Sequence, residues 1–441
     1  MSPAENSEML STGQEMHGWA QDLFPVARSI TGEGVRFTLQ YLQRLLPSLE
    51  IQSVPSGYQA FDWIVPDEWW IRDAWIENEA GERVIDFKNN NLHVLGYSEP
   101  VDQWMSLEDL QSHLYSLPDQ PDAIPYITSY YQRRWGFCLT HKQRQSLAPG
   151  SYRAVVDSEI KPGVLNYAEL VIPGQTQREI FLSTYVCHPS MANNELSGPV
   201  VTTAIARWLH SLPKRKHTYR IVFIPETIGS LVYLSTNLVQ LKDKVVAGFN
   251  VTCIGDDRAY SYLPSRVGSS ISDVAARHVL RHIDANYHRY SWLDRGSDER
   301  QYCAPGIDLP IASIMRTKYG RYPEYHTSLD DLTLVTPSGL EGGFNALKKA
   351  IEAIEYDCTP RVTVLGEPQL GKRGLYPTLS TKQTNSAVRN MMNLISYADG
   401  QRTLLDIAET IDVPVWELRE LVATLAHSGL LEFVPHAEDV Q

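Results

Sequence analysis

The chain has 441 residues, a formal net charge of −13 and five cysteines. Its length provides for about three domains of ~150 residues each, and the acidic balance argues against a surface that follows a nucleic-acid backbone. The N-terminus is polar and acidic, without an apolar core of secretory length, and no apolar run approaches the ~20 residues that span a bilayer. We therefore expect a cytoplasmic protein without nucleic-acid or membrane partners. The sequence leaves open whether it forms a homo-oligomer. The cysteines are scattered and odd in number, which predicts free buried thiols.

The N-terminal part, residues 1–57, is predicted to be helical. Residues 14–25 and 34–46 carry apolar side chains at helical spacing, and the turn-rich string RSITGEG separates them. From 58 to 155 the pattern changes to short β-rich segments bounded by turn formers, such as FDWIVPDEWWIRDAWIEN. This change predicts an inserted β-rich domain, whose tryptophans either pack in a core or line a substrate cleft.

Strand and helix patterns alternate through residues 156–360. Strands are expected in REIFLSTYVCHPS, YRIVFIPE, VVAGFNVTCIGD and LPIASIMR, which favours an α/β fold with a mostly parallel sheet flanked by helices. Ligands of open α/β sheets gather at the carboxyl ends of such strands. His188, Glu226 and Asp256 are expected at those ends.

A Pro- and Gly-containing linker at 361–382 is expected to lead into a winged helix at 383–441. The candidate recognition helix, PVWELRELVATLAHSG, carries Glu417 and Glu420 against one arginine, Arg419. Such a helix has too few basic side chains to make many contacts with DNA phosphates. The pattern therefore favours a packing or partner-docking role over DNA binding.

Two histidines and one glutamate suggest metal chemistry. A lone histidine after a strand, such as His188, is usually structural, but His326 supplies a second histidine in the string YPEYHTSLDDL. Neutral imidazoles bind zinc, and a strand-end carboxylate such as Glu226 can take the proton of a metal-activated water. The adjacent Cys187 is not expected to form a nucleophile pair with His188, because neighbours along a strand point to opposite faces.

These segments resemble two families. The order of ANNELSG, ETIG, NVTCIG, GSDERQY and EYHTSLDD is similar to that of the zinc aminopeptidases with a co-catalytic metal pair. Together with RSITGEG, FDWIVPDEW, IPYITSYY, WGFC and CHPSMANNELSG, they resemble more sharply a bacterial family of aminopeptidase-like proteins that carry a nested domain of unknown function and a C-terminal winged helix. The resemblance spans nearly the whole chain. It implies a zinc-aminopeptidase-like fold and, from the polysaccharide or secondary-metabolite gene sets of that family, a specialised hydrolase.

The chain departs from the two-metal pattern at its acidic positions. By resemblance His188 and His326 match the two histidine ligands, and Glu226 matches the general base. Two zinc ions share a site only where carboxylates cancel their charge, so the sequence predicts a single zinc. Four positions that are acidic in the pattern are not acidic here: Ser190, Asn194, Thr227 and Thr252.

The third zinc ligand and the substrate contacts stay open at this point. Glu195, Asn194 or Glu226 itself could complete the metal site, since catalytic zinc usually has three protein ligands. Glu195, Asp256 or Asp298 could bind a substrate amino group by charge. Asp298 and Arg300, on the loop GSDERQYCAPG, lie either near the site or in a local ion pair.

The predicted function is zinc-dependent hydrolysis of an amide bond in a small peptide, aminoacyl or acyl-amide substrate, with Glu226 as general base. The alternative is a binding or scaffold protein that keeps the fold without the reaction. Amide formation or acyl transfer is a third hypothesis, because glutaminyl cyclase is a one-zinc relative of these peptidases.

Overall fold

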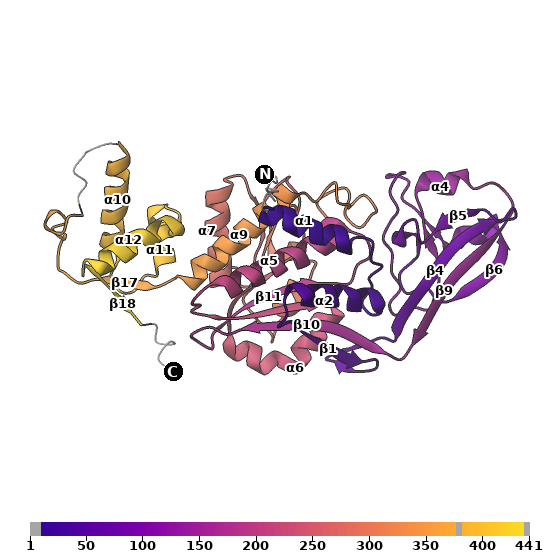
Figure 1. Ribbon diagram of the computed structural model, residues 1–441, viewed down its shortest axis with the longest axis horizontal. Helices are drawn as coiled ribbons and strands as arrows, with labels where there is room; N and C mark the ends of the chain where they lie inside the picture. The colour runs from indigo at the N-terminus through magenta and orange to yellow at the C-terminus, as the bar shows by residue number, and fades with distance from the viewer. Residues whose placement is uncertain (1–9, 376–381, 436–441) are drawn as a thin grey trace, which may run out of the picture.

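A mixed eight-stranded sheet forms the centre of the protein, with a smaller antiparallel sheet at one end and a group of three helices at the other (Figure 1). The computed structural model describes residues 10–375 and 382–435. In spatial order the strands of the main sheet are β1 (Glu50–Pro55), β10 (Val164–Ile172), β12 (Thr218–Ile224), β11 (Glu179–Tyr185), β13 (Val245–Asn250), β16 (Ile311–Met315), β14 (Ser261–Leu263) and β15 (His288–Arg289).

The middle of this sheet is parallel. The pairs β12–β11, β11–β13 and β13–β16 are parallel, whereas β1, β10 and β14 pair antiparallel toward the edges. All seven residues of β11 are buried, as expected for a parallel strand covered on both faces. The predicted α/β class with a mostly parallel, mixed sheet is confirmed.

Helices cover both faces of the sheet. Figure 1 shows α1, α2, α5, α7 and α9 on one side and α6 on the other. On α2 the apolar residues Val35, Leu39 and Leu42 are buried at helical spacing, as the sequence pattern predicts. The helices are α1 (Thr12–Leu23), α2 (Glu33–Leu45), α5 (Ser197–Ser211), α6 (Ile228–Lys244), α7 (Ile271–Ile283), α8 (Glu299–Tyr302) and α9 (Pro337–Glu355).

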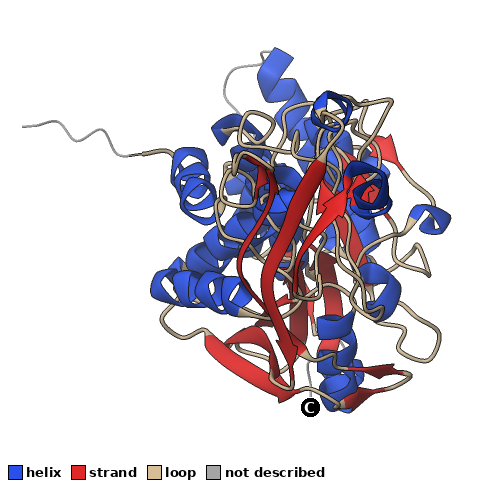
Figure 2. Cartoon of the chain, turned by 90° about the vertical axis from the view of Figure 1, so that its right-hand side faces the viewer, coloured by secondary structure: helices blue, strands red, loops and turns tan. Residues whose placement is uncertain are grey.

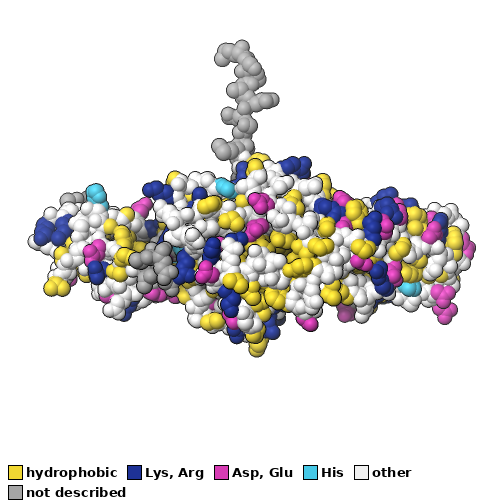
Figure 3. All heavy atoms as spheres, turned by 90° about the horizontal axis from the view of Figure 1, so that it is seen from below, with side chains coloured by type: hydrophobic (Ala, Val, Ile, Leu, Met, Phe, Trp, Pro, Cys, Tyr) yellow, Lys and Arg dark blue, Asp and Glu magenta, His cyan; other side chains and the backbone are white. Residues whose placement is uncertain are grey.

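The segment after β1 forms the smaller sheet, seen in front in Figure 2. Its strands pair antiparallel in the order β5 (Arg83–Asp86), β4 (Glu68–Asn78), β9 (Ser151–Lys161) and β6 (Val101–Ser106). Acidic and basic side chains are interspersed on its surface (Figure 3), as in the ion pair of Arg72 with Asp157. Around it lie β2 (Gln59–Ala60), β3 (Trp63–Ile64), α3 (Leu107–Leu110), β7 (Leu114–Tyr115), β8 (Phe137–Cys138) and α4 (His141–Ser146).

The C-terminal part contains α10 (Lys382–Tyr397), α11 (Leu404–Ile411), α12 (Val415–His427) and a two-stranded hairpin. The hairpin pairs β17 (Thr359–Val362) with β18 (Leu431–Val434). The linker expected at 361–382 therefore begins inside β17. The sequence did not predict this strand, because antiparallel pairing between segments this far apart leaves no local sequence signal. Part of that linker and the C-terminal end of the expected winged helix lie outside the described residues.

The winged helix packs against the main domain through α7. His278 is fully buried; its Nε2 accepts a hydrogen bond from the Val415 amide at 2.9 Å, and its Nδ1 lies 2.5 Å from Glu409. On α12 the Arg419 guanidinium lies over the Tyr356 ring at the end of α9, so the single arginine of the candidate recognition helix faces the protein. Among the helices that the structure describes, none has the length and apolarity needed to cross a membrane.

Candidate active site

A pocket of about 320 Å³ lies where β11 and β12 end, between the main sheet and the inserted domain. His188 follows β11, Glu226 follows β12, and both line the pocket together with His326 and Arg300. The carboxyl ends of neighbouring parallel strands meet at one edge of a sheet, which is why these segments converge. Four of the residues singled out from the sequence are therefore brought into one pocket.

The ring of His188 is held in place by Glu195. The Oε2 atom of Glu195 lies 3.1 Å from His188 Nδ1 and accepts the His188 backbone N–H at 2.9 Å. With the proton on Nδ1, the Nε2 lone pair is directed toward Glu226, whose Oε2 lies 3.8 Å away. Burial lowers the pKa of His188, but the hydrogen bond and charge of Glu195 raise it above the ordinary value of 6.5. The site therefore favours a positive charge between His188 and Glu226.

Glu195 is itself fixed by a buried arginine. Arg28 Nε lies 3.0 Å from Glu195 Oε1, and both side chains are completely buried. Arg28 also donates to the His188 carbonyl at 2.9 Å. Glu195 reaches back to His188 because Ala192–Leu196 forms a π-helical turn, a widened turn that often occurs at functional sites. Glu195 thus takes the position of a carboxylate that steadies a histidine, a role different from the metal ligand or substrate contact that the sequence suggests for it.

Glu226 lies in a protected environment suited to a base. Burial raises its pKa, while the charge of His188 lowers it. Asp298 is fully buried nearby, and burial together with the charge of Glu226 raises the pKa of Asp298 to about 8. A carboxylate with a raised pKa in a pocket is a candidate for proton transfer.

Asp298 organises the residue after Glu226. Its Oδ1 accepts the Thr227 backbone N–H at 2.7 Å and the Ser230 hydroxyl at 2.8 Å. Thr227 has a φ of 65°, a strained conformation for a β-branched residue. The side chain of Asp298 therefore holds the backbone of the pocket wall and does not line the pocket, in contrast to the substrate contact predicted for it.

His326 is the second imidazole of the pocket. Its φ is 57°, and its ring stacks on Tyr325 with a centroid distance of 3.9 Å. Burial, together with the charge of His188, lowers the pKa of His326 to about 3. His326 is therefore neutral near pH 7 and available as a metal ligand.

Two imidazoles and one carboxylate of the pocket are the candidate donors for a metal ion. The two ring centroids lie 5.6 Å apart, and two imidazoles sharing one zinc bring their centroids to about 5–6 Å. Glu226 Oε2 is close enough to His188 Nε2 to bind the same ion or to accept a proton from a ligand of that ion. The two histidines and Glu226 form the set that could hold zinc.

Among the described residues, the group whose ligand atoms all lie within 4.8 Å of one another is Cys187, His188 and Glu195. Burial and the charge of Glu195 hold the pKa of the Cys187 thiol well above its ordinary range, and the Arg28 guanidinium neutralises Glu195. A neutral thiol and an arginine-paired carboxylate are poor ligands. The pocket side of His188 is therefore the better metal position.

Asn194 and Asp256 do not reach the pocket. The Asn194 side chain accepts from the Tyr185 hydroxyl at 3.1 Å, and its backbone N–H donates to Asp330 at 2.9 Å. Asp256 is fully buried and accepts from the backbone and the hydroxyl of Thr317. Both side chains stabilise loops behind the pocket.

Cys187 and His188 come closer together than strand alternation predicts. β11 ends at Tyr185, so both residues lie in a loop, and Cys187 Sγ is 3.4 Å from His188 Nδ1. The expectation that the two side chains cannot meet is wrong. The raised pKa of the thiol nevertheless makes Cys187 a poor nucleophile.

The inserted domain forms one wall of the pocket. The Tyr126 backbone N–H donates to the His326 carbonyl at 2.9 Å, and the Ser328 N–H donates to Ile124, which joins the inserted domain to the His326 loop. Tyr126 packs against the rings of both histidines, at centroid distances of 5.2 Å and 5.1 Å. The sequence alone assigned no role to Tyr126 or to the other tyrosines of the string IPYITSYY, although that string contributed to the resemblance.

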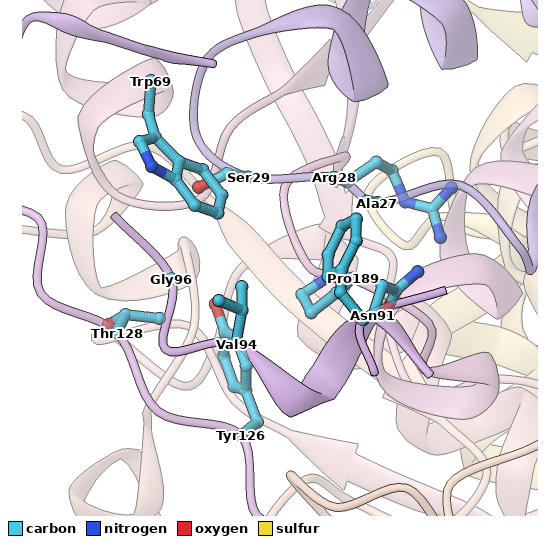
Figure 4. A pocket seen from close by; sticks show the side chains of 11 residues that line it. Ala27, Arg28, Ser29, Trp69, Asn91, Val94, Gly96, Tyr126, Thr128 and Pro189 are labelled. Carbon is cyan, nitrogen blue, oxygen red and sulfur yellow. The ribbon is translucent and has the colours of Figure 1, made fainter. Parts of the chain in front are cut away.

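A small cavity of about 20 Å³ lies behind this wall (Figure 4). It shares Tyr126 and Thr128 with the pocket and is also lined by Trp69, Arg28 and Pro189. Figure 4 shows the Arg28 guanidinium pointing away from Trp69; the ion pair of Arg28 is with Glu195. The cavity is thus lined both by the inserted domain and by Arg28, which supports His188 through Glu195.

Comparison with known proteins identifies both parts of the chain. Residues 17–357 match a family described as a domain of unknown function (DUF4910), and residues 358–433 match a winged helix-turn-helix family. A protein of Clostridium acetobutylicum is 43% identical over 425 residues, which cover 96% of this chain and 97% of that protein. It is named "Putative polysaccharide biosynthesis protein with aminopeptidase-like domain".

Solved structures agree with this fold. The crystal structure of a "putative peptidase" from Clostridium acetobutylicum has a TM-score of 0.91 and 40% identity, covering 96% of this chain and 97% of that one. A zinc aminopeptidase from Bacillus subtilis has a TM-score of 0.57 and 12% identity, covering 79% of this chain and 96% of its own. At this identity the second similarity concerns the fold alone. The predicted aminopeptidase-like fold with a C-terminal winged helix is confirmed.

Proposed function

The chain belongs to the family described as a domain of unknown function (DUF4910), and from its pocket we propose that it is a zinc-dependent amide-bond hydrolase acting on a small peptide, aminoacyl or acyl-amide substrate. The proposal is carried by the convergence of His188 Nε2, His326 and Glu226 in one pocket. The aminopeptidase-like fold of the similar proteins is consistent with this chemistry.

Each residue has a separate task. His188 and His326 would hold one zinc ion, which would supply a polarised carbonyl group and a more acidic water. Glu195 keeps the proton of His188 on Nδ1, so that Nε2 faces the pocket. Glu226 accepts the proton of the water and returns it to the leaving amine, a task that suits its raised pKa.

The first experiment is elemental analysis of the protein purified without added zinc. We expect about one zinc per chain in the parent, from the pair of imidazoles in the pocket, and little in His188→Ala or His326→Ala. Absence of zinc in the parent, even after zinc is supplied, would refute the hydrolase mechanism and favour a binding or scaffold protein. Thr227, which stands where the resembling two-metal enzymes have an acidic ligand, is compatible with that alternative.

Glu226→Gln distinguishes the two possible roles of Glu226. A general base can be removed without loss of the metal, whereas removal of a third ligand lowers metal content as well. We expect Glu226→Gln to keep its zinc and to lose turnover of aminoacyl amides, short peptides or acylated sugars by about 100-fold or more. Loss of both metal and turnover would make Glu226 a ligand.

A further inference from the structure

We infer that the pocket takes an anionic amide, with Arg300 as the residue that recognises a carboxylate of the substrate, and that it is not built for a free amino terminus. This inference rests on the proposed function, because it names the substrate class of the same site. It follows from the charged side chains that line the pocket and from the nearby carboxylates that are already paired with other residues.

A substrate ammonium group would find no free acidic partner. Glu226 is the only carboxylate among the described residues that line the pocket, and its Oε2 already lies 3.8 Å from His188 Nε2. The three acids that charge alone suggested for amine binding, Glu195, Asp256 and Asp298, are fully buried.

Each of these three acids is already engaged. Glu195 pairs with Arg28, Asp256 accepts from Thr317, and Asp298 accepts from Thr227. None of these three carboxylates is therefore available to compensate a desolvated cation in this pocket.

Arg300 offers the opposite charge. It is exposed, lines the pocket, and its Nη2 donates to Thr227 Oγ1 at 2.6 Å. In the described part of the chain no carboxylate forms an ion pair with it. Its remaining N–H groups can bind a carboxylate in the two-pronged geometry that a guanidinium favours.

Thr227 gives this arginine a defined position. Asp298 holds the Thr227 backbone in its strained conformation, and the Thr227 hydroxyl then receives Arg300. A side chain tethered in this way loses less freedom when it binds a ligand than a free surface arginine does. The strain at Thr227 therefore serves to place a cation at the pocket wall.

Another part of the pocket lining is aromatic. Trp63 and Tyr131 of the inserted domain line the pocket, remain 40% and 56% exposed, and meet edge to face at 5.8 Å. Exposed aromatic faces bind planar or apolar groups. A ligand that carries both a carboxylate and an apolar acyl or side-chain group matches Arg300 and this aromatic part of the lining.

The experiment uses three probes of similar size that differ in charge: N-acetylphenylalanine is anionic, N-acetylphenylalaninamide is neutral and phenylalaninamide is cationic. Binding of each to the full chain is measured by calorimetry, independently of turnover. We expect the anionic probe to bind at least about tenfold more tightly than the cationic one.

The Arg300→Gln variant tests the assigned residue. It should weaken the anionic probe about tenfold or more and leave the neutral probe within about twofold, since one charge-assisted contact is lost. The matched control is Arg389→Gln, which removes an exposed arginine from α10 of the winged helix. It should bind all three probes as the parent does.

Three results would overturn the inference: equal or tighter binding of the cationic probe, a preference for the anion that survives in Arg300→Gln, or no detectable binding of the anionic probe at millimolar concentration. Zinc analysis of the same samples keeps the two proposals apart. A chain that contains zinc and prefers the cationic probe retains the proposed reaction and loses only this substrate class.

Discussion

The buried ion pair of Arg28 and Glu195 should dominate the stability of the site. Both side chains are fully buried at 3.0 Å, so removing one partner leaves an uncompensated charge, which costs about 3–5 kcal/mol. Glu195→Gln belongs at the upper end of this range, because a guanidinium cannot give up its proton. The loss for Arg28→Met should lie near the lower end, since the buried carboxylate of Glu195 can become neutral by binding a proton.

The double variant distinguishes a paired charge from ordinary packing. Once both charges are absent, no charge is left buried, and the loss should be smaller than the sum of the two single losses by about 2–3 kcal/mol. The hydrogen bond from Arg28 to the His188 carbonyl is lost in both variants that contain Arg28→Met, so it cancels in the comparison.

Equilibrium urea unfolding, followed by tryptophan fluorescence with a chelator present, measures the four free energies of unfolding. The chelator prevents differences in metal binding from adding to stability. Additive losses would refute the argument, because they would mean that Arg28 and Glu195 do not compensate each other. The zinc affinity of Glu195→Gln gives a second measurement, and it should fall about 10- to 100-fold as His188 loses its support.

Three further predictions concern other parts of the chain. The pKa of His326 is lowered to about 3 in the folded state from about 6.5 when unfolded, so its stabilising contribution is complete above pH 6.5 and is lost as the pH falls. Between pH 6.5 and 5 the metal-free parent should lose about 2 kcal/mol more than His326→Asn, measured by urea unfolding at each pH; equal losses would contradict the buried neutral ring. His278→Leu should destabilise by about 2 kcal/mol, because the Val415 amide loses its buried acceptor, and proteolysis should then release the winged helix; an unchanged digestion pattern would contradict the docking role. Gly18→Ala should stabilise α1 by about 0.5–1 kcal/mol, since a Cβ there meets no atom within 4 Å, whereas Gly198→Ala should destabilise by about 1–3 kcal/mol because its Cβ would lie 2.4 Å from the Val251 carbonyl oxygen; thermal shifts of the same sign would refute this contrast.

Most secondary-structure elements of the main domain could be predicted from local pattern. The buried face of α2 repeats at Val35, Leu39 and Leu42, and the continuous apolar run of β11 marks a central strand. His188 and Glu226 could be placed for the same reason, since each directly follows such a strand. Local periodicity reports which side of an element is buried, and that requires no knowledge of its neighbours.

The roles of the acidic residues could not be predicted in this way. Charge alone made Glu195, Asp256 and Asp298 candidates for a ligand or a substrate, but their partners come from distant segments: Arg28 precedes α2, Thr317 follows β16, and Thr227 precedes α6. Whether a carboxylate is free or engaged depends on what packs against it. Spacing along the chain contains no such information.

The sequence by itself determined the order of the elements, the strand ends that carry chemistry and the loss of acids from a two-metal pattern. Only the tertiary structure decided that Tyr126 joins the inserted domain to the His326 loop, that a π-helical turn directs Glu195 to His188, and that β17 pairs with β18. The physical reason is that elements form from local conformational preference and burial, whereas these contacts join segments far apart in the chain and exist only once the whole core has packed.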